Sequence, residues 1–129
     1  MTKVTKETVK IFANGIKDFM THLGLGDWEI TLKQEDLTNL GDNTLACVAG
    51  DIDNCVAAFE IAENWPETEA QVKDNIRKTA LHECLHVLLY RYDRLAQDRF
   101  TTEKQLADAE HDVIRRLVML YTETRRKDK

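Results

Sequence analysis

Two histidines and a glutamate within five residues form the pattern in this chain that indicates a specific chemistry. Residues 82–86 read His-Glu-Cys-Leu-His, an HExxH motif. If this segment is helical, His82 and His86 project from one face on successive turns and can bind the same metal ion. Glu83 lies beside them, and its carboxylate can accept a proton from a metal-bound water. The motif therefore predicts a zinc site with His82 and His86 as ligands and Glu83 as general base.

A catalytic zinc ion usually has three protein ligands, so a third ligand must come from another segment. The last predicted helix offers Glu110 and His111. Glu110 falls in the middle of the apolar stripe of that helix, whereas His111 lies about 100° round the helix axis. A carboxylate that faces the core is costly unless a cation meets it, so we expect Glu110 to be the third ligand. The stripe consists of Leu106, Val113, Leu117 and Leu120.

Each of these assignments has an alternative. An HExxH sequence can occur by accident in a helix, with histidines that form ordinary hydrogen bonds. Glu110 could instead form an ion pair with an arginine of a neighbouring helix. His111 is the predicted catalytic donor to the oxyanion, a role that Tyr121 could also take, but His111 is equally consistent with an exposed or helix-capping histidine. Tyr90 is expected to be a packing residue.

Length and composition place the protein in a broad class. The chain has 129 residues, which predicts a single domain over residues 1–129. Its formal net charge of −5 argues against general binding to nucleic acid or to an anionic membrane. We expect a cytoplasmic protein, because the sequence shows neither a signal-peptide pattern nor a run of about 18 apolar residues. Cys47, Cys55 and Cys84 are expected to be free thiols, and nothing in the sequence indicates the oligomeric state.

Hydrophobic periodicity predicts the elements of the N-terminal half. A helix is expected from Val9 to Leu23, where Gly24 and Gly26 end it. Alternating residues predict a strand over 27–32, and a polar loop with Asp42 and Asn43 follows it. Residues 45–50 and 55–61 then predict an antiparallel hairpin that turns at residues 51–54.

Two capping-box patterns predict the helices of the C-terminal half. Thr68–Gln71 begins a helix that carries HExxH to about Tyr92, and Thr102–Gln105 begins a final helix that runs to about Thr124. The expected fold class is α+β. It consists of a helix, a three-stranded and mainly antiparallel sheet, and two further helices, of which the first carries HExxH.

With a strand before the motif and a glutamate on the following helix, the chain resembles compact zincin metallopeptidases with a glutamate ligand, the gluzincins. It is similar to small zincin-like proteins of bacteria and phages, including the SprT-like and ImmA-like groups. The resemblance implies that His82, His86 and Glu110 bind zinc and that Glu83 is the catalytic base. It also implies that the strand Ala57–Ile61 is the sheet edge along which a peptide or protein substrate pairs.

The expected function is therefore that of a zinc metallopeptidase, which hydrolyses peptide bonds. Two other classes compete with it. The first is a metal-dependent hydrolase of amide or phosphodiester bonds that are not peptides. The second is a binding or regulatory protein whose zinc is structural or vestigial, which the small size of the chain keeps in consideration.

Overall fold

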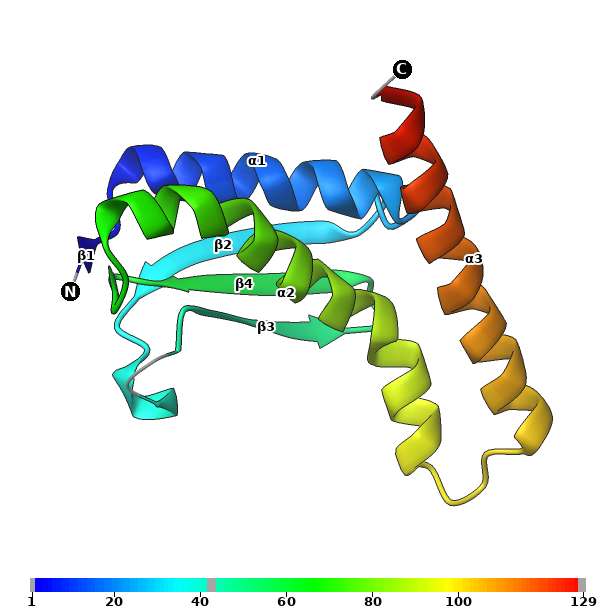
Figure 1. Cartoon of the computed structure of the whole chain (residues 1–129). Coiled ribbons are helices and arrows are strands. Elements are labelled where there is room, and N and C mark those ends of the chain that lie inside the picture. Colours follow the sequence, from blue (N-terminus) through cyan, green and yellow to red (C-terminus); the bar gives the residue numbers. More distant parts are fainter. Residues whose placement is uncertain (1, 42–43, 128–129) are drawn as a thin grey trace.

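The computed structural model describes residues 2–41 and 44–127, and Asp42 and Asn43 of the predicted loop lie outside this part. The described residues form an α+β fold of helices on one face of a small sheet (Figure 1). The helices are α1 (Lys6–His22), α2 (Glu69–Gln97) and α3 (Glu103–Lys127), with a short 3-10 helix at Thr38–Leu40. The strands are β1 (Thr2–Lys3), β2 (Glu29–Glu35), β3 (Ala46–Asp51), β4 (Val56–Ala62) and β5 (Asn64–Trp65).

The main sheet is mixed, with the strand order β2-β4-β3. The predicted hairpin is confirmed, because β3 pairs antiparallel with β4, but β2 pairs with β4 in parallel. The expectation of a mainly antiparallel sheet is therefore correct for one of its two pairings. The most apolar strand takes the central position, since Ala57, Phe59 and Ile61 of β4 are at most 1% exposed. Its backbone groups pair with a strand on each edge, as the buried backbone of a central strand requires.

The hydrophobic core lies between this sheet and the two helices that cover it. Helix α1 contributes Phe12, Ile16 and Met20, which are four residues apart and therefore share one face of the helix. The predicted end of this helix is confirmed, because Gly24 follows it with φ of 73°. Helix α2 contributes Val72, Ile76, Ala80, Cys84, Val87 and Leu88.

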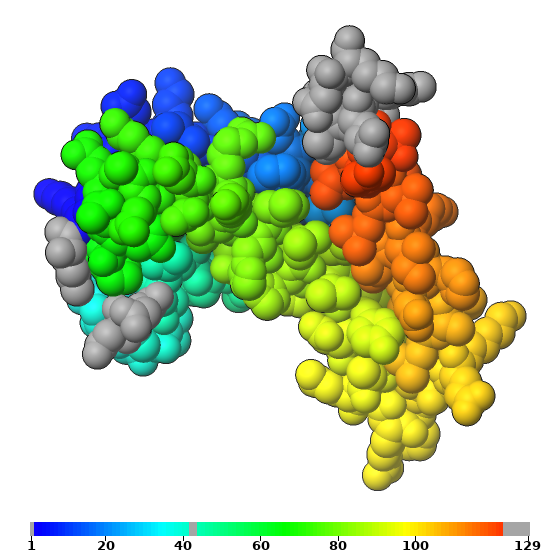
Figure 2. All heavy atoms as spheres, in the orientation of Figure 1, coloured from blue at the N-terminus to red at the C-terminus, as the bar shows by residue number. Residues whose placement is uncertain are grey.

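The C-terminal half of α2 extends beyond the sheet, and α3 returns along it to the end of α1 (Figure 1). The connection between α2 and α3 projects from the body of the molecule (Figure 2). Arg116 connects α3 to the end of α1. Its guanidinium donates hydrogen bonds to the carbonyl oxygens of Leu23 and Gly24 at 2.7 and 2.8 Å. In the described part of the chain, no helix combines the length and the apolar character needed to cross a membrane.

Candidate metal centre

The helix that carries the HExxH motif begins at the predicted capping box. The Gln71 amide donates to the Thr68 hydroxyl at 3.3 Å, and the Thr68 amide donates to the Gln71 side chain at 2.9 Å. The helix continues to Gln97, beyond the predicted end near Tyr92. Residues 82–86 therefore lie in its interior, where the regular hydrogen bonding of the backbone fixes the directions of their side chains.

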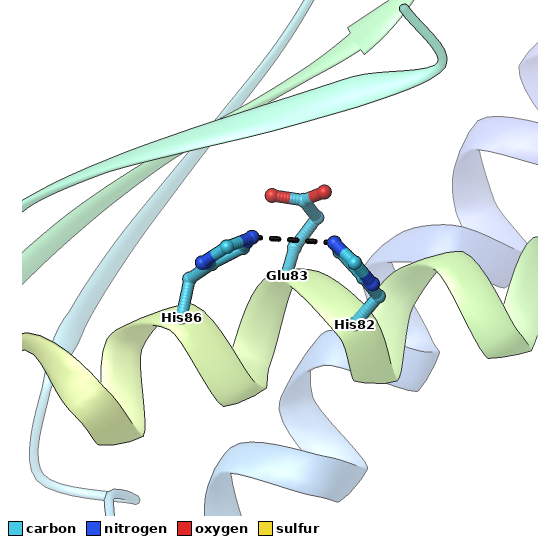
Figure 3. A group of neighbouring side chains, drawn as sticks. All are labelled: His82, Glu83 and His86. Carbon is cyan, nitrogen blue, oxygen red and sulfur yellow. Dashed lines mark hydrogen bonds between the residues drawn. The ribbon is translucent and has the colours of Figure 1, made fainter.

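His82 and His86 converge as their spacing predicts. Their Nε2 atoms are 3.2 Å apart, and the ring centroids are separated by 4.9 Å (Figure 3). Two nitrogens that bind one tetrahedral zinc ion at about 2.0–2.1 Å lie about 3.3 Å from each other. The same separation permits a hydrogen bond when one ring carries its proton on Nε2. Both side chains are exposed, so a metal ion can reach them from solvent.

Glu83 belongs to the buried face of α2, although the two histidines do not. The residue is 6% exposed. Among the described residues, Glu83 is the only charged or polar residue that is buried. Its carboxylate lies beside the pair of imidazole rings, displaced from the line that joins their nitrogens (Figure 3), and the three potential ligand atoms are all within 4.8 Å of one another. Burial raises the pKa of this carboxyl, while the positive charges that His86 and His82 can carry oppose the rise. The group can therefore hold a metal ion, and its carboxylate has an increased affinity for a proton.

A hollow of about 290 Å³ lies between this part of α2 and strand β3. Tyr90 closes one side of it, and its hydroxyl donates a hydrogen bond of 2.9 Å to the carbonyl oxygen of Val48. Sequence reasoning treated Tyr90 as a packing residue, although its position four residues after His86 placed it near the same helix face. The complete lining consists of Ala46, Cys47, Val48, His82, Glu83, His86 and Tyr90.

The sheet edge beside the motif is β3. The resemblance to gluzincins had assigned this role to Ala57–Ile61, and that assignment is wrong, because β4 pairs with a strand on each side. The Ala62 amide donates to the Leu45 carbonyl oxygen at 2.9 Å, so the backbone of Leu45 faces β4. Directions alternate along an antiparallel strand, and the backbone groups of Ala46 and Val48 consequently face away from β4. These groups border the hollow.

Neither Glu110 nor His111 joins the His82–Glu83–His86 group within the described residues. The expectation that Glu110 faces the core is wrong, because its side chain is exposed and its neighbour Ala109 is buried, with 2% exposure. His111 is also exposed, and its Nδ1 lies 2.8 Å from the carbonyl oxygen of Ala107 on its own helix. The structure thus removes the argument that made Glu110 the third ligand.

The error arises from the width of the apolar arc on α3. Leu117 was assigned to the core but is 39% exposed, while Ala109 and Val113 face the rest of the molecule. Further apolar residues on the outer side of this arc, Ile114, Val118, Met119 and Tyr121, are 46–61% exposed. Since apolar residues cover more of the helix than is buried, the pattern alone did not identify the buried part.

The cysteines are free thiols, as expected. Burial is the main cause that raises the pKa of Cys84 to about 12, which argues against a nucleophilic thiolate at this position. Cys47 borders the hollow, but its thiol lies 3.7 Å from the Glu60 carboxylate, and burial followed by the Glu60 charge raises its pKa. The chemistry of this site therefore depends on the imidazoles and the Glu83 carboxylate.

No family model matches the chain, and neither curated proteins nor solved structures give a significant match. The geometry of the site is therefore the basis for the function proposed below.

Proposed function

We propose that this protein is a zinc-dependent hydrolase that cleaves peptide bonds. The observation that carries the proposal is the arrangement at residues 82–86, where two Nε2 atoms lie 3.2 Å apart beside a buried carboxylate. The separation matches that of two zinc ligands, and imidazole is a preferred zinc ligand. The neighbouring hollow provides space for a substrate.

In this proposal His82 and His86 hold the metal through their Nε2 atoms. A bound zinc ion would supply a Lewis acid and lower the pKa of a water molecule. Glu83 accepts the proton of the attacking water and later transfers it to the leaving amine. Burial raises the pKa of Glu83 and so brings it closer to neutral pH. A group that acts first as a base and then as an acid works best when its pKa is near the operating pH.

A peptide substrate is favoured by the sheet edge along the hollow. The outward backbone groups of Ala46, together with the Val48 amide, can form hydrogen bonds with an extended chain, as in strand addition. The Val48 carbonyl already accepts the Tyr90 hydroxyl. Non-peptide substrates would leave these backbone groups without a defined role, so we place hydrolysis of other amide or phosphodiester bonds second.

A metal-binding protein without turnover is a further candidate, and the composition of the group favours it. Among the described residues, the group that could hold a metal ion consists of His82, Glu83 and His86, so Glu83 supplies its only carboxylate. If Glu83 binds the metal directly, it completes a three-ligand set on a single helix but is no longer free to act as a base. The two roles of Glu83 therefore separate an enzyme from a binding protein.

Zinc analysis combined with a peptide-library assay tests the proposal. Purified protein should bind one zinc ion per chain, and the zinc-loaded protein should cleave peptides that the metal-free protein leaves intact. The His82→Ala variant should lose both properties, whereas the His22→Ala variant should retain both, since His22 is at the end of α1 and outside the metal-binding group. Zinc binding without peptide cleavage would favour the binding protein or a hydrolase of other bonds, and absence of zinc binding would contradict all three candidates.

A further inference from the structure

A second hollow opens beside the metal centre and shares Ala46, His82 and Glu83 with it. Its volume is about 400 Å³, and it extends along the N-terminal half of α2 to Glu67 and Asn75. A substrate at the metal centre therefore has room to place one side chain in this hollow. The remaining lining residues are Thr44, Leu45, Lys78 and Thr79.

The Glu67 carboxylate is held in a defined position at the end of the hollow. The Asn75 side-chain amide donates a hydrogen bond of 2.9 Å to its Oε2 atom, and the Thr2 hydroxyl donates to its main-chain carbonyl oxygen. The residue is partly buried. Among the side chains that the structure describes, those of residues 2–41 and 44–122, no cation forms an ion pair with this carboxylate. A ligand cation could therefore compensate its charge.

The length of the hollow suits a long side chain. Asn75 precedes His82 by seven residues, which corresponds to about 10 Å along the helix axis. Leu45 and Ala46 provide an apolar wall for methylene groups, and the fixed Glu67 carboxylate lines the same hollow. Lysine and arginine side chains combine an apolar stem with a positively charged end. They therefore match a hollow that has an apolar wall and a carboxylate.

We propose that the hollow is a subsite for a lysine or arginine side chain of the substrate, with the Glu67 carboxylate as its charge partner. The inference deepens the proposed function and rests on it, because the metal centre determines where the substrate lies. Lys78 borders the same hollow and favours the opposite charge. Lys78 is exposed, so solvent screens its ammonium group and the flexible side chain can turn away, whereas the Glu67 carboxylate is held in place.

Three fluorescent peptides test the subsite, and they differ only in the residue whose side chain is to occupy the hollow. This residue is lysine, uncharged norleucine of similar shape, or glutamate. For the zinc-loaded protein the measurement is kcat/KM, and for the metal-free protein it is Kd by fluorescence anisotropy. We expect the lysine peptide to be preferred over the norleucine peptide by about three- to fivefold in both measurements. The Glu67→Gln variant should abolish this preference, because glutamine keeps the acceptor for Asn75 but removes the charge.

The Lys78→Gln variant should increase the preference for lysine, because it removes the repelling charge. Glu69→Gln is the matched control, since Glu69 is a neighbouring exposed carboxylate that pairs with Lys73 at 4.0 Å and does not line the hollow. It should leave the preference unchanged. A preference for glutamate, or equal effects of Glu67→Gln and Glu69→Gln, would overturn the subsite while cleavage itself still supported the hydrolase. Lysine-selective binding without cleavage would support the subsite and contradict the proposed hydrolase.

Discussion

The aromatic ring of Tyr90 lies directly against the backbone of Gly50. A Cβ atom added at Gly50 would be 2.0 Å from Cε2 of this ring, far inside van der Waals contact. The Tyr90 hydroxyl also donates to the carbonyl oxygen of Val48, two residues earlier on the same strand. Tyr90 therefore joins α2 to β3 through one packing contact and one hydrogen bond. This contact sets the distance between the metal-binding helix and the sheet edge that borders the hollow.

The Gly50→Ala variant should displace the Tyr90 ring, because the new methyl group occupies its position. We expect a loss of about 1–3 kcal/mol in the free energy of unfolding, measured by urea denaturation. The Tyr90→Phe variant keeps the ring and removes only the hydrogen bond to Val48, so it should lose about 1 kcal/mol. Ala49→Gly is the control for a change on the same strand. Unchanged stability of Gly50→Ala would contradict the close packing of Tyr90 on β3.

The Glu83→Gln variant separates the two roles of this side chain. If Glu83 is the base, the variant should bind zinc as tightly as the wild-type chain, while peptide turnover falls by about 100-fold or more. The amide has a similar shape but cannot accept the proton. Competition with a chromogenic chelator measures the zinc affinity. Weakened zinc binding in this variant would instead identify Glu83 as a ligand and favour the binding protein.

Stability of the metal-free protein should depend on the ionisation of Glu83. Burial raises the pKa of this carboxyl in the folded state, so the folded chain holds the proton more tightly than the unfolded chain. The resulting stabilisation is fully present below the ordinary pKa of about 4.3 and is lost as the pH rises through the higher folded value. The melting temperature of Glu83→Gln relative to wild type should therefore increase from pH 4 to pH 7 in the presence of chelator. A difference that is independent of pH would contradict the raised pKa.

The parts of the site that local sequence determines could be predicted. The capping box at Thr68 begins α2, and the i, i+4 spacing alone brings His82 and His86 together on it. These features depend on contacts between residues close in the sequence, for which helical geometry gives definite positions.

The relations between separate elements could not be derived in the same way. Strand β4 has apolar residues that suit a central strand, but the sequence did not reveal that β2 would pair with it in parallel. On α3 the apolar arc is wider than the buried face, so the rotation of the helix was left undetermined and Glu110 was assigned to the core. Tyr90 and Gly50 are in contact although they are 40 residues apart in the sequence, and no local sequence pattern indicates this contact. In each case, tertiary packing selects one of several arrangements that the pattern permits.

The exposure of Glu110 and His111 changes the expectation for zinc binding. Since neither residue lies in the His82–Glu83–His86 group, Glu110→Ala and His111→Ala should each retain zinc with less than about a threefold change in affinity. His86→Ala is the positive control and should lose the metal. The measurement is chelator competition on folded protein. If Glu110→Ala lost zinc, α3 would have to turn on metal binding and bring the carboxylate to the site.

Proline substitutions at two neighbouring residues of the edge strand β3 test peptide binding, because one should affect peptide cleavage and the other the stability of the fold. The Val48 amide faces away from β4, so Val48→Pro removes a donor available to a substrate without removing a bond of the sheet. Cleavage of a peptide should fall by about two- to tenfold, while the melting temperature changes little. The backbone of Ala49 faces β4, and Ala49→Pro should instead destabilise the hairpin and lower the melting temperature. Normal peptide turnover by a folded Val48→Pro variant would show that the substrate does not pair with the Val48 amide.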